Sequence, residues 1–301
     1  MSVNGILCVD KPPAMTSFSC CGAVRRITGA QKAGHAGTLD PMATGVLPVL
    51  LGAATRALDF LPDHTKRYVA ALRFGEVSDT LDAWGKVTET GRPLPRREAV
   101  EEALAAFRGD ILQVPPMTSA LKKEGVRLYE LARRGETVER EPRPVTVFTL
   151  ELLEYDENAG VARLDCACSK GTYIRSICHD LGQALGCGAV MTGLRRTAAL
   201  GFTEQQILTL EQARALAEAG ELARRVIPLF DALGAYPLLT VTGPQGVRFR
   251  NGGALSLDRL PAPVEGICRV CDPAGHFLGL GRPVGEELTV ARLFPGLEHD
   301  L

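Results

Sequence analysis

A charged, proline-rich segment interrupts the middle of the sequence, and strand patterns stand on both sides of it. Residues 113–144 read QVPPMTSALKKEGVRLYELARRGETVEREPRP. The apolar content of this segment is too thin to form a core, although Leu128–Arg134 at its centre has a helical pattern. Strand patterns precede it at Lys66–Phe74 and follow it at Val145–Leu153 and Val161–Cys168. The sequence therefore predicts a strand-containing core from which residues 113–144 project as an insertion.

Helices and further strands are expected before and after this interrupted core. Thr16 and Ser17 are helix-capping residue types and Gly29 is a helix-ending one, so a helix is expected between them. Arg97–Phe107 has the amphipathic pattern of a helix that Gly109 ends. The other expected elements are strands at Gly5–Val9 and Val46–Leu51, a helix at Ala53–Leu61 ended by Pro62, a polar loop at Ser78–Gly85, a helix at Ser176–Leu185 and a helix-rich stretch at Thr209–Arg225. This mixture predicts an α+β fold.

A change of pattern near Leu233–Pro237 marks a domain boundary. The residues after it form short apolar stretches separated by Gly, Pro and Asp, which is the pattern of a small β-barrel or sandwich. We therefore predict a large domain at residues 1–233, with the insertion at about 113–144, and a small β-rich domain at residues 237–301.

The overall charge limits the kinds of partner that this chain can bind. Its formal net charge is -1, and 46% of the residues are hydrophobic and 23% charged, as in ordinary globular proteins. A nearly neutral chain is not a general polyanion-coating protein, so any nucleic-acid binding must come from local clusters of Lys and Arg. The apolar stretch at the N-terminus is too short for a signal sequence, and no run approaches the roughly 18 apolar residues of a membrane helix. We therefore expect no membrane association.

The nine cysteines predict a reducing compartment, the cytoplasm, because their number is odd and they lack the spacing of a disulfide framework. Cys268 and Cys271 have the spacing of half a metal site. A zinc site needs four ligands, and the sequence offers no second pair and no His at ligand spacing nearby. We expect these two thiols to lie in a strand, and we predict no metal site.

Asp40 stands between a glycine-rich turn and Pro41, directly before an apolar run, in the stretch GHAGTLDPMATGVLPVLLG at residues 34–52. The glycines match neither a Walker nor a Rossmann phosphate-binding pattern. His35 and Asp40 suggest two members of a nucleophilic triad, but the sequence has no Gly-x-Ser-x-Gly elbow. On pattern alone, Asp40 is best interpreted as a turn or helix-cap carboxylate.

The longer stretch GHAGTLDPMATGVLPVLLGAATR closely resembles the signature of the TruB family, the tRNA pseudouridine-55 synthases. Further agreements occur in the order of the family. They are Lys11-Pro12, Thr16-Ser17, Lys66-Arg67-Tyr68, QVPPMTSALK at 113–122, RLYELARRG at 127–135, GTYIRS at 171–176 and LRRT at 194–197. The phrase FLGLGRP near the C-terminus is similar to the small PUA-like RNA-binding barrel of many members. Two departures are Ala14, where the family usually has Gly, and Thr118, where an aromatic residue is common.

The resemblance implies a pseudouridine-synthase catalytic domain with a mixed, mostly antiparallel sheet and a thumb-like insertion, followed by a PUA-like barrel. It implies an isomerase that breaks the glycosidic bond of a uridine in the tRNA T-arm loop, turns the uracil and rejoins it through carbon. No cofactor and no metal are implied. Asp40 corresponds to the catalytic aspartate, Arg175 to its cationic partner and Tyr68 to the tyrosine against the target base. A cation is needed because burial alone would raise the pKa of a nucleophilic carboxylate.

The resemblance also implies substrate-binding residues. His35 corresponds to the residue that fills the space vacated by the flipped uridine, and flipping costs a few kcal/mol. Lys11 is assigned to substrate binding, and Tyr173 and Leu194 to the pocket lining. Lys66 and Arg67 form one basic cluster for phosphate contacts. The other candidate phosphate-binding residues are Arg25, Arg26, Lys32, Lys122, Lys123, Arg127, Arg133 and Arg134.

The expected partner is tRNA through its T-arm stem-loop, bound by a monomer without an obligatory protein partner. Two alternatives stay open. A guide-RNA-dependent synthase of the archaeal and eukaryotic type shares the GTLDP region, but the insertion at 113–144 favours the stand-alone kind. A catalytically silent tRNA-binding or tRNA-folding protein would keep the basic clusters and would not need Asp40, Tyr68 and Arg175 together.

Overall fold

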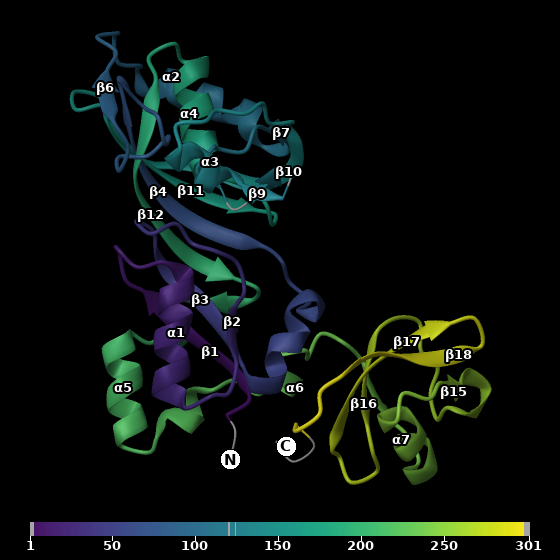
Figure 1. Cartoon of the computed structure of the whole chain (residues 1–301). Helices are drawn as coiled ribbons and strands as arrows, with labels where there is room; N and C mark the ends of the chain where they lie inside the picture. The colour runs from purple at the N-terminus through teal and green to yellow at the C-terminus, as the bar shows by residue number, and fades with distance from the viewer. Residues whose placement is uncertain (1–2, 120, 124, 298–301) are drawn as a thin grey trace. The chain divides into compact units, whose positions relative to one another are not determined.

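The computed structural model describes residues 3–119, 121–123 and 125–297 of the chain, and these divide into two compact units (Figure 1). Unit 1 contains the residues up to Asp40, Val46–Asp63 and the residues from Glu204 onward. Unit 2 contains Pro41–Gly45 and His64–Thr203. The predicted insertion includes Ala120 and Glu124, and the predicted terminal domains include residues 1–2 and 298–301; these residues lie outside the described ones.

Unit 2 is built on a mixed, mostly antiparallel sheet, which confirms the predicted fold class. Its strands lie in the order β12, β4, β11, β10 and β7, and each pair of neighbours is antiparallel. They span Ala189–Ala199 (β12), Lys66–Phe74 (β4), Val161–Cys168 (β11), Arg143–Asp156 (β10) and Gly109–Gln113 (β7). The short β13 (Phe202–Thr203) pairs with β12. Thr44 and Gly45, the first residues of β3 (Thr44–Leu51), pair with β12 in the parallel direction.

Side chains alternate along β4 as the sequence pattern predicts. Tyr68, Ala70, Leu72 and Phe74 are buried, and the residues between them are half-buried or exposed. The period of two places these four side chains on one face of the strand. Helix α4 (Ile174–Ala184) packs on β12 and β4, and α2 (Arg97–Leu104) packs on β10. The helix α2 continues into a short 3-10 helix, η2 (Ala105–Phe107).

The insertion leaves the sheet and returns to it at one pair of residues, because Gln113 at the end of β7 pairs with Arg143 at the start of β10. Between them lie the two-residue strands β8 (Lys122–Lys123) and β9 (Val126–Arg127), which pair with each other, and helix α3 (Leu128–Arg133). The predicted helix at the centre of the insertion is thus confirmed. Leu128 and Leu131 of α3 are buried, so the insertion has a small apolar contact of its own.

The predicted polar loop at Ser78–Gly85 joins two short strands. These are β5 (Glu76–Ser78) and β6 (Val87–Glu89), which pair antiparallel. The Asp82 side chain within the loop is buried and accepts hydrogen bonds from the Thr80 hydroxyl at 2.8 Å and the Trp84 backbone N–H at 3.0 Å. The loop is therefore folded around a carboxylate.

The core of unit 1 contains β1 (Gly5–Lys11) beside β3, with β2 (Ala33–His35) antiparallel to the later residues of β3. Helix α1 (Ser17–Thr28) begins after Thr16, whose hydroxyl accepts from Ser19 N–H at 3.0 Å, and it ends at Gly29 with a φ of 66°. Both predicted helix ends are confirmed. The remaining helices of this core are α5 (Leu210–Glu218), α6 (Leu229–Ala232), η3 (Glu204–Gln206) and η4 (Leu222–Arg225).

The helix predicted at Ala53–Leu61 is a 3-10 helix, η1 (Gly52–Phe60), instead of an α-helix. Ala54 and Ala57, three residues apart, are both fully buried. A 3-10 helix has three residues per turn, so it aligns residues at this spacing on one face. The Thr55 hydroxyl also donates to the Gly52 carbonyl at 2.8 Å, which closes the first turn.

The C-terminal residues form a curled five-stranded sheet, in the order β14, β16, β17, β18 and β15 (Figure 1). The strands are Leu238–Thr240 (β14), Cys268–Cys271 (β16), Phe277–Val284 (β17), Glu287–Leu293 (β18) and Leu255–Ser256 (β15). Helix α7 (Gly243–Arg250) and η5 (Leu257–Arg259) accompany them. Val241, Phe249, Val270 and Leu288 belong to one buried cluster of this sheet. The small β-rich fold is confirmed, while its boundary at residue 237 stays a prediction.

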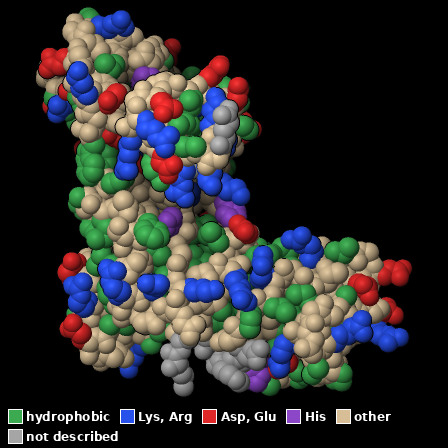
Figure 2. Space-filling model, viewed as in Figure 1, with side chains coloured by type: hydrophobic (Ala, Val, Ile, Leu, Met, Phe, Trp, Pro, Cys, Tyr) green, Lys and Arg blue, Asp and Glu red, His purple; other side chains and the backbone are tan. Residues whose placement is uncertain are grey.

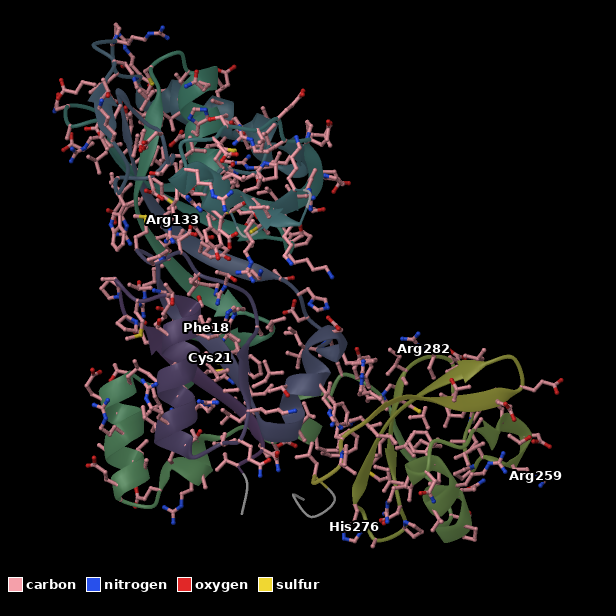
Figure 3. All side chains as sticks on the ribbon, viewed as in Figure 1. Phe18, Cys21, Arg133, Arg259, His276 and Arg282 are labelled. Carbon is pink, nitrogen blue, oxygen red and sulfur yellow. The ribbon has the colours of Figure 1, made fainter. Side chains whose placement is uncertain are left out.

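Arg259 of η5 and Arg282 of β17 are exposed in this C-terminal part of the chain, and Figure 3 labels both together with His276, which precedes β17. Cys268 and Cys271 lie buried in β16, as the sequence predicts. Within the described part of the chain, no helix is both long and apolar enough to cross a membrane.

Candidate active site

The predicted site residues fall into both units. Unit 1 contains three of them, Lys11, His35 and Asp40. Unit 2 contains the other six, which are Lys66, Arg67, Tyr68, Tyr173, Arg175 and Leu194.

The loop before Asp40 is held through the backbone of its neighbour Leu39. The Ser17 hydroxyl donates to the Leu39 carbonyl at 3.1 Å and accepts from the Leu39 N–H at 2.8 Å. Ser17 is buried in the first turn of α1, and Leu39 is buried as well. A hydroxyl that bonds both the N–H and the carbonyl of one buried residue fixes the position of that residue. Ser17 therefore fixes where the chain presents the half-buried Asp40.

Lys11 stabilises the turn that precedes α1. Its side chain is fully buried, and its ammonium donates to the carbonyls of Pro12 at 2.8 Å and Met15 at 2.6 Å. Within this turn Ala14 has a φ of 60°, the left-handed region in which glycine is favoured. The departure from the usual glycine thus keeps the glycine-like conformation. The structure gives Lys11 this role in the turn, and its contact with substrate stays a prediction.

His35 is the last residue of β2 and lies opposite Val49 of β3. The next residue, Ala36, donates its N–H to the Pro48 carbonyl at 3.0 Å. The His35 side chain is half-buried. The end of a paired strand therefore carries this imidazole, a few residues before Asp40.

Gly45 lies where the residues after Asp40 approach β12. It has a φ of 99°, and a Cβ added to it would lie 2.2 Å from the Arg196 carbonyl oxygen. Only glycine fits this approach. The parallel pairing of Gly45 with Arg196 thus ties the TLDPMATG stretch to a strand of unit 2.

Tyr68 lies in the buried row of β4, opposite Cys166 of β11 and Arg196 of β12. Leu194 of β12 pairs with Ala70, the next residue of the same row. The two predicted base-contacting residues therefore lie on neighbouring strands.

Burial lowers the pKa of the Lys66 ammonium, and the positive charge of Arg196 lowers it further.

Arg67 forms an ion pair within the sheet. Its Nε lies 2.9 Å from Oδ1 and 3.1 Å from Oδ2 of Asp165 on β11. The hydrogen bond to Asp165 and the charge of that carboxylate raise the pKa of the Arg67 guanidinium. Because 57% of the Arg67 side chain stays exposed, it can still face a phosphate.

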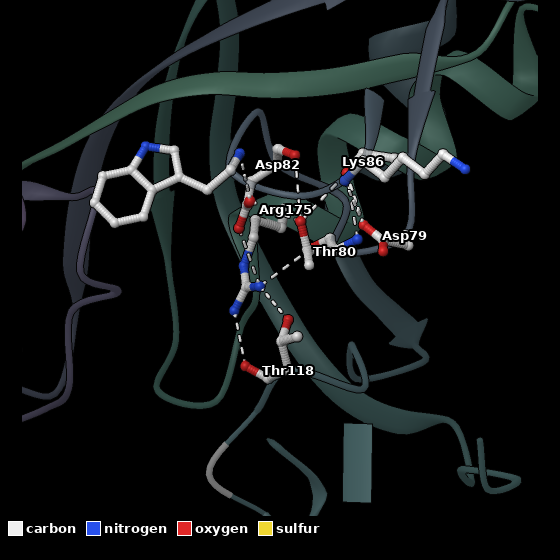
Figure 4. Close-up of polar contacts among 8 residues, drawn as sticks. Asp79, Thr80, Asp82, Lys86, Thr118 and Arg175 are labelled. Carbon is white, nitrogen blue, oxygen red and sulfur yellow. Dashed lines mark hydrogen bonds and ion pairs between the residues drawn. The ribbon is translucent and has the colours of Figure 1, made fainter. Parts of the chain in front are cut away.

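Arg175, the second residue of α4, is held by its guanidinium group (Figure 4). Its Nη1 lies 3.3 Å from Oδ2 of Asp82 and donates to the Thr80 carbonyl at 3.2 Å. The Nη1 also donates to the Thr118 hydroxyl, and Nη2 donates to the Thr118 carbonyl at 3.2 Å. Only 4% of the Arg175 side chain and 9% of the Asp82 side chain are exposed. A buried guanidinium requires such pairing, because an unpaired buried charge is strongly unfavourable.

The start of α4 is joined to the start of the insertion. The Gln113 side chain accepts from Tyr173 N–H at 2.7 Å and donates to the Tyr173 carbonyl at 3.0 Å. The Ser176 hydroxyl donates to the Val114 carbonyl at 3.0 Å. These bonds flank Arg175 on both sides in sequence, so they fix the backbone from which its side chain extends.

The family models match most of the chain. The model described as the TruB family pseudouridylate synthase N-terminal domain matches residues 25–174, and the model of the tRNA pseudouridylate synthase B C-terminal domain matches residues 175–233. The chain belongs to the TruB family. Asp40, Tyr68 and Tyr173 lie in the first matched region, and Arg175 is the first residue of the second.

Relatives in the TruB family align with this chain over nearly their whole length. The tRNA pseudouridine synthase B of Dechloromonas aromatica is 44% identical over 281 residues, which are 93% of this chain and 92% of the relative. That of Stutzerimonas stutzeri is 45% identical over 293 residues, which are 96% of this chain and 94% of the relative.

Solved structures with a similar fold also cover most of the chain. One is the crystal structure of a Cbf5–Nop10–Gar1 complex, with a TM-score of 0.72, 26% identity, and coverage of 96% of this chain and 84% of the other. The structure of an H/ACA RNP bound to a substrate RNA containing 2′-deoxyuridine has a TM-score of 0.72 at 23% identity, covering 98% of this chain and 86% of the other. The second similarity shows the fold alone.

Several residues of this TruB-family chain hold predicted site residues or their neighbours without having been predicted to do so. Ser17, Asp82 and Gln113 are three of them. Ser17 was expected only at the start of a helix, although its position in the Thr16-Ser17 agreement was a signal. Asp82 was predicted only as part of a polar loop. A buried arginine needs a counter-ion, and this need could have directed attention to Asp79 and Asp82, the two aspartates of that loop. Gln113 opens the insertion, and no sequence signal pointed to its bonds with Tyr173.

Lys and Arg side chains gather on the viewed face of each unit. In unit 1 they lie across α1 and η1, and in unit 2 they surround α3 and β9 of the insertion (Figure 2). Arg127 and Arg133 lie over the Tyr129 ring, with guanidinium carbons 5.8 and 5.5 Å from its centre; Figure 3 labels Arg133 on α3. The insertion thus carries five of the ten residues predicted to contact phosphates, which are Lys122, Lys123, Arg127, Arg133 and Arg134.

Most thiols of the chain are poor candidates for catalysis, although a hydrogen bond with the Cys166 side chain lowers the pKa of Cys168. All nine are free and buried, and burial raises the pKa of Cys8 to about 12 and that of Cys20 to about 11. A thiol with such a pKa is protonated at neutral pH and is a weak nucleophile. Across residues 3–119, 121–123 and 125–297, no group of three or more His, Cys, Asp or Glu side chains is placed to hold a metal ion.

Proposed function

We propose that this chain is a tRNA pseudouridine synthase that isomerises the uridine of the T-arm loop. The observation that carries the proposal is full-length similarity: relatives named tRNA pseudouridine synthase B align with 93% of this chain or more. The match includes GHAGTLDP, the stretch that contains Asp40. The fold and the buried, hydrogen-bonded arginine at the start of α4 agree with it.

In the proposed reaction the Asp40 carboxylate is the nucleophile: it forms a transient covalent bond to the substrate, and that bond breaks again before the product leaves, which regenerates the free carboxylate. The glycosidic C–N bond breaks, the uracil turns, and a C–C bond joins ring carbon 5 to the ribose. The hydrogen on carbon 5 leaves as a proton and the ring nitrogen gains one, so the product is an isomer of the substrate. Arg175 supplies a permanent positive charge beside the carboxylate, because a guanidinium stays protonated throughout the physiological pH range. Tyr68 lies against the base and takes part in proton transfer.

The target uridine must leave its stack before it can react, and we assign this step to His35. A planar imidazole at the end of β2 can stack on neighbouring bases and fill the vacated space. Tyr173 and Leu194 line the pocket for the flipped base, and Lys11 contributes from its buried turn. Lys66, Arg67 and the basic residues of the insertion contact phosphates. Affinity for tRNA therefore falls as the salt concentration rises.

We also propose that the chain works in the cytoplasm as a monomer, without an obligatory protein partner. Nine free thiols are compatible with a reducing compartment. The insertion supplies basic residues that an unaided enzyme needs to hold tRNA.

The test is release of tritium from tRNA labelled at carbon 5 of uridine, measured in a single turnover with enzyme in excess. The parent protein should release tritium, and Asp40→Asn should be slower by at least about a thousandfold, because it replaces the nucleophile. Affinity of the variant for tRNA should stay within about threefold of the parent, since amide and carboxylate have nearly the same size. Asp59→Asn, at an exposed aspartate of η1, is the matched control and should react like the parent. Equal rates for Asp40→Asn and the parent would remove Asp40 from the mechanism.

The similarity to a chain of the archaeal box H/ACA sRNP Nop10–Cbf5 complex favours one second candidate, a guide-RNA-dependent synthase. The same assay separates the two. Release from bare tRNA, without any guide RNA or added protein, is expected for the stand-alone enzyme. Release that begins only when a guide RNA and partner proteins are added would support the second candidate.

A further inference from the structure

The insertion contributes a direct contact to Arg175 through Thr118. The Thr118 hydroxyl accepts from Nη1 and the Thr118 carbonyl accepts from Nη2, so one residue contacts both terminal nitrogens of the guanidinium. Asp82 and Thr80 approach the same group through Nη1, from the loop between β5 and β6 (Figure 4). Contacts to both ends of a planar group fix its rotation as well as its position. Thr118 therefore constrains the plane of the guanidinium.

Thr118 is itself connected to the part of the insertion that carries basic residues. Its neighbour Ser119 accepts, through its carbonyl, the N–H of Tyr129 in α3 at 3.1 Å. Leu128 N–H donates to the Leu121 carbonyl at 2.8 Å, and Arg140 donates to the Pro115 carbonyl at 3.2 Å. The segment around Thr118 is thus hydrogen-bonded to α3 and to Arg140 near the end of the insertion. These bonds hold it in addition to its covalent connection to Gln113.

The hydroxyl contact depends on the identity of residue 118. From the sequence, Thr118 was noted only as a departure from the resembled family. The structure instead gives the small side chain a hydrogen bond with Arg175. An alkyl side chain of the same size, such as valine, has no oxygen to accept that bond.

We propose that Thr118 is a positioning residue for the uridine isomerisation, because its hydroxyl orients the Arg175 guanidinium from the insertion. The inference rests on the proposed function. It assigns to the insertion a second role besides holding RNA. A contact to a charged donor is worth more than a neutral hydrogen bond, so its loss affects the reaction measurably.

The test compares Thr118→Val with Thr118→Ser in the single-turnover tritium assay, alongside the parent and Asp40→Asn. Thr118→Val should react about tenfold more slowly, which corresponds to about 1.4 kcal/mol. Its tRNA dissociation constant should stay within about twofold of the parent, since the hydroxyl faces Arg175. Thr118→Ser keeps the hydroxyl and should retain at least about half of the parent rate. Thr146→Val, which removes a surface hydroxyl bonded to Asp110 at 2.7 Å, is the matched control and should react like the parent.

Three outcomes with an active parent would overturn the inference. They are a parental rate for Thr118→Val, an equal fall for Thr118→Ser, and a loss confined to tRNA affinity. If Thr118→Val does not fold by circular dichroism, Thr118→Ala replaces it under the same criteria. A parent protein that releases no tritium refutes the proposed function, and the inference falls with it. Failure of the inference alone is therefore recognised by a parent protein that stays active together with one of these three outcomes.

Discussion

The segments that carry the proposed nucleophile and its proposed cation are held in different ways. In unit 1, the Ser17 hydroxyl is hydrogen-bonded to the backbone N–H and carbonyl of Leu39, the residue directly before Asp40. In unit 2, the guanidinium of Arg175 itself donates hydrogen bonds to Asp82, Thr80 and Thr118. The difference suits the two roles. A nucleophile must change its bonding during the reaction, so the fold secures it through its neighbour, whereas a cation acts by staying in one place.

This difference also predicts two scales of mutational effect. The bonds of Ser17 are neutral hydrogen bonds, each of which contributes about 0.5–1.5 kcal/mol. Removing one partner of a buried ion pair costs about 3–5 kcal/mol, since the remaining charge is left uncompensated. Substitutions that remove the contacts of Arg175 should therefore destabilise the protein more than those that remove the contacts of Ser17. Three substitutions test the way in which these segments are held.

The largest effect is expected for Asp82→Asn. The substitution keeps the size of the side chain and removes the charge that faces buried Arg175, so the free energy of unfolding should fall by about 3 kcal/mol or more. Urea unfolding measures this change, and the tritium assay should show a slower single turnover. Asp79→Asn is the matched control, because Asp79 is exposed in the same loop. If both variants unfold at the same urea concentration, the charge of Asp82 does not stabilise Arg175.

A smaller effect is expected for Ser17→Ala. It leaves the buried N–H and carbonyl of Leu39 without the hydroxyl, at a cost of about 1–3 kcal/mol in the free energy of unfolding. Turnover should slow as well, because the backbone before Asp40 is no longer held. Ser19→Ala, two residues further along the same helix, removes only an exposed hydroxyl that accepts a hydrogen bond from the Thr16 hydroxyl, so it controls for helix propensity. Two variants with the same stability and rate would show that the Leu39 backbone is fixed by other contacts.

The smallest effect, of opposite sign, is expected for Ala14→Gly. Ala14 has a φ of 60° in the turn closed by Lys11, and glycine adopts this conformation without strain. The relief of about 1–2 kcal/mol is partly offset by the greater freedom of glycine in the unfolded chain, which leaves a gain of about 0.5 kcal/mol. Urea unfolding at closely spaced concentrations can detect it. A lower midpoint would mean that the turn does not strain Ala14, and that α1 begins from a relaxed turn.

Much of the fold could be predicted from local sequence patterns. The alternation in Lys66–Phe74 and the thin apolar content of residues 113–144 correctly predicted a sheet strand and an insertion with a central helix. The helix at Ala53–Leu61 was less well predicted, because the spacing of its buried alanines fits three residues per turn and the sequence pattern does not separate this from an α-helix.

The side-chain pairs of the site could not be predicted in this way. Ser17 and Leu39 are 22 residues apart, Thr118 and Arg175 are 57 apart, and Asp82 and Arg175 are 93 apart. Such pairs are created by the folding of the sheet and leave no periodic signal along the chain. The family motif identified Asp40, Tyr68 and Arg175 as candidates, and the fold was needed to find the residues that hold two of them.

The insertion begins and ends at the pair formed by Gln113 and Arg143. Residues paired across antiparallel strands have Cα atoms only about 4.5–5.5 Å apart. The pairing of β7 with β10 therefore does not depend on how many residues connect Gln113 to Arg143. The entropic cost of closing a loop also grows slowly with its length. The length of the insertion beyond Thr118 can therefore change while the register of β7 and β10 is preserved, whereas the residues up to Thr118 are constrained by their hydrogen bonds to α4.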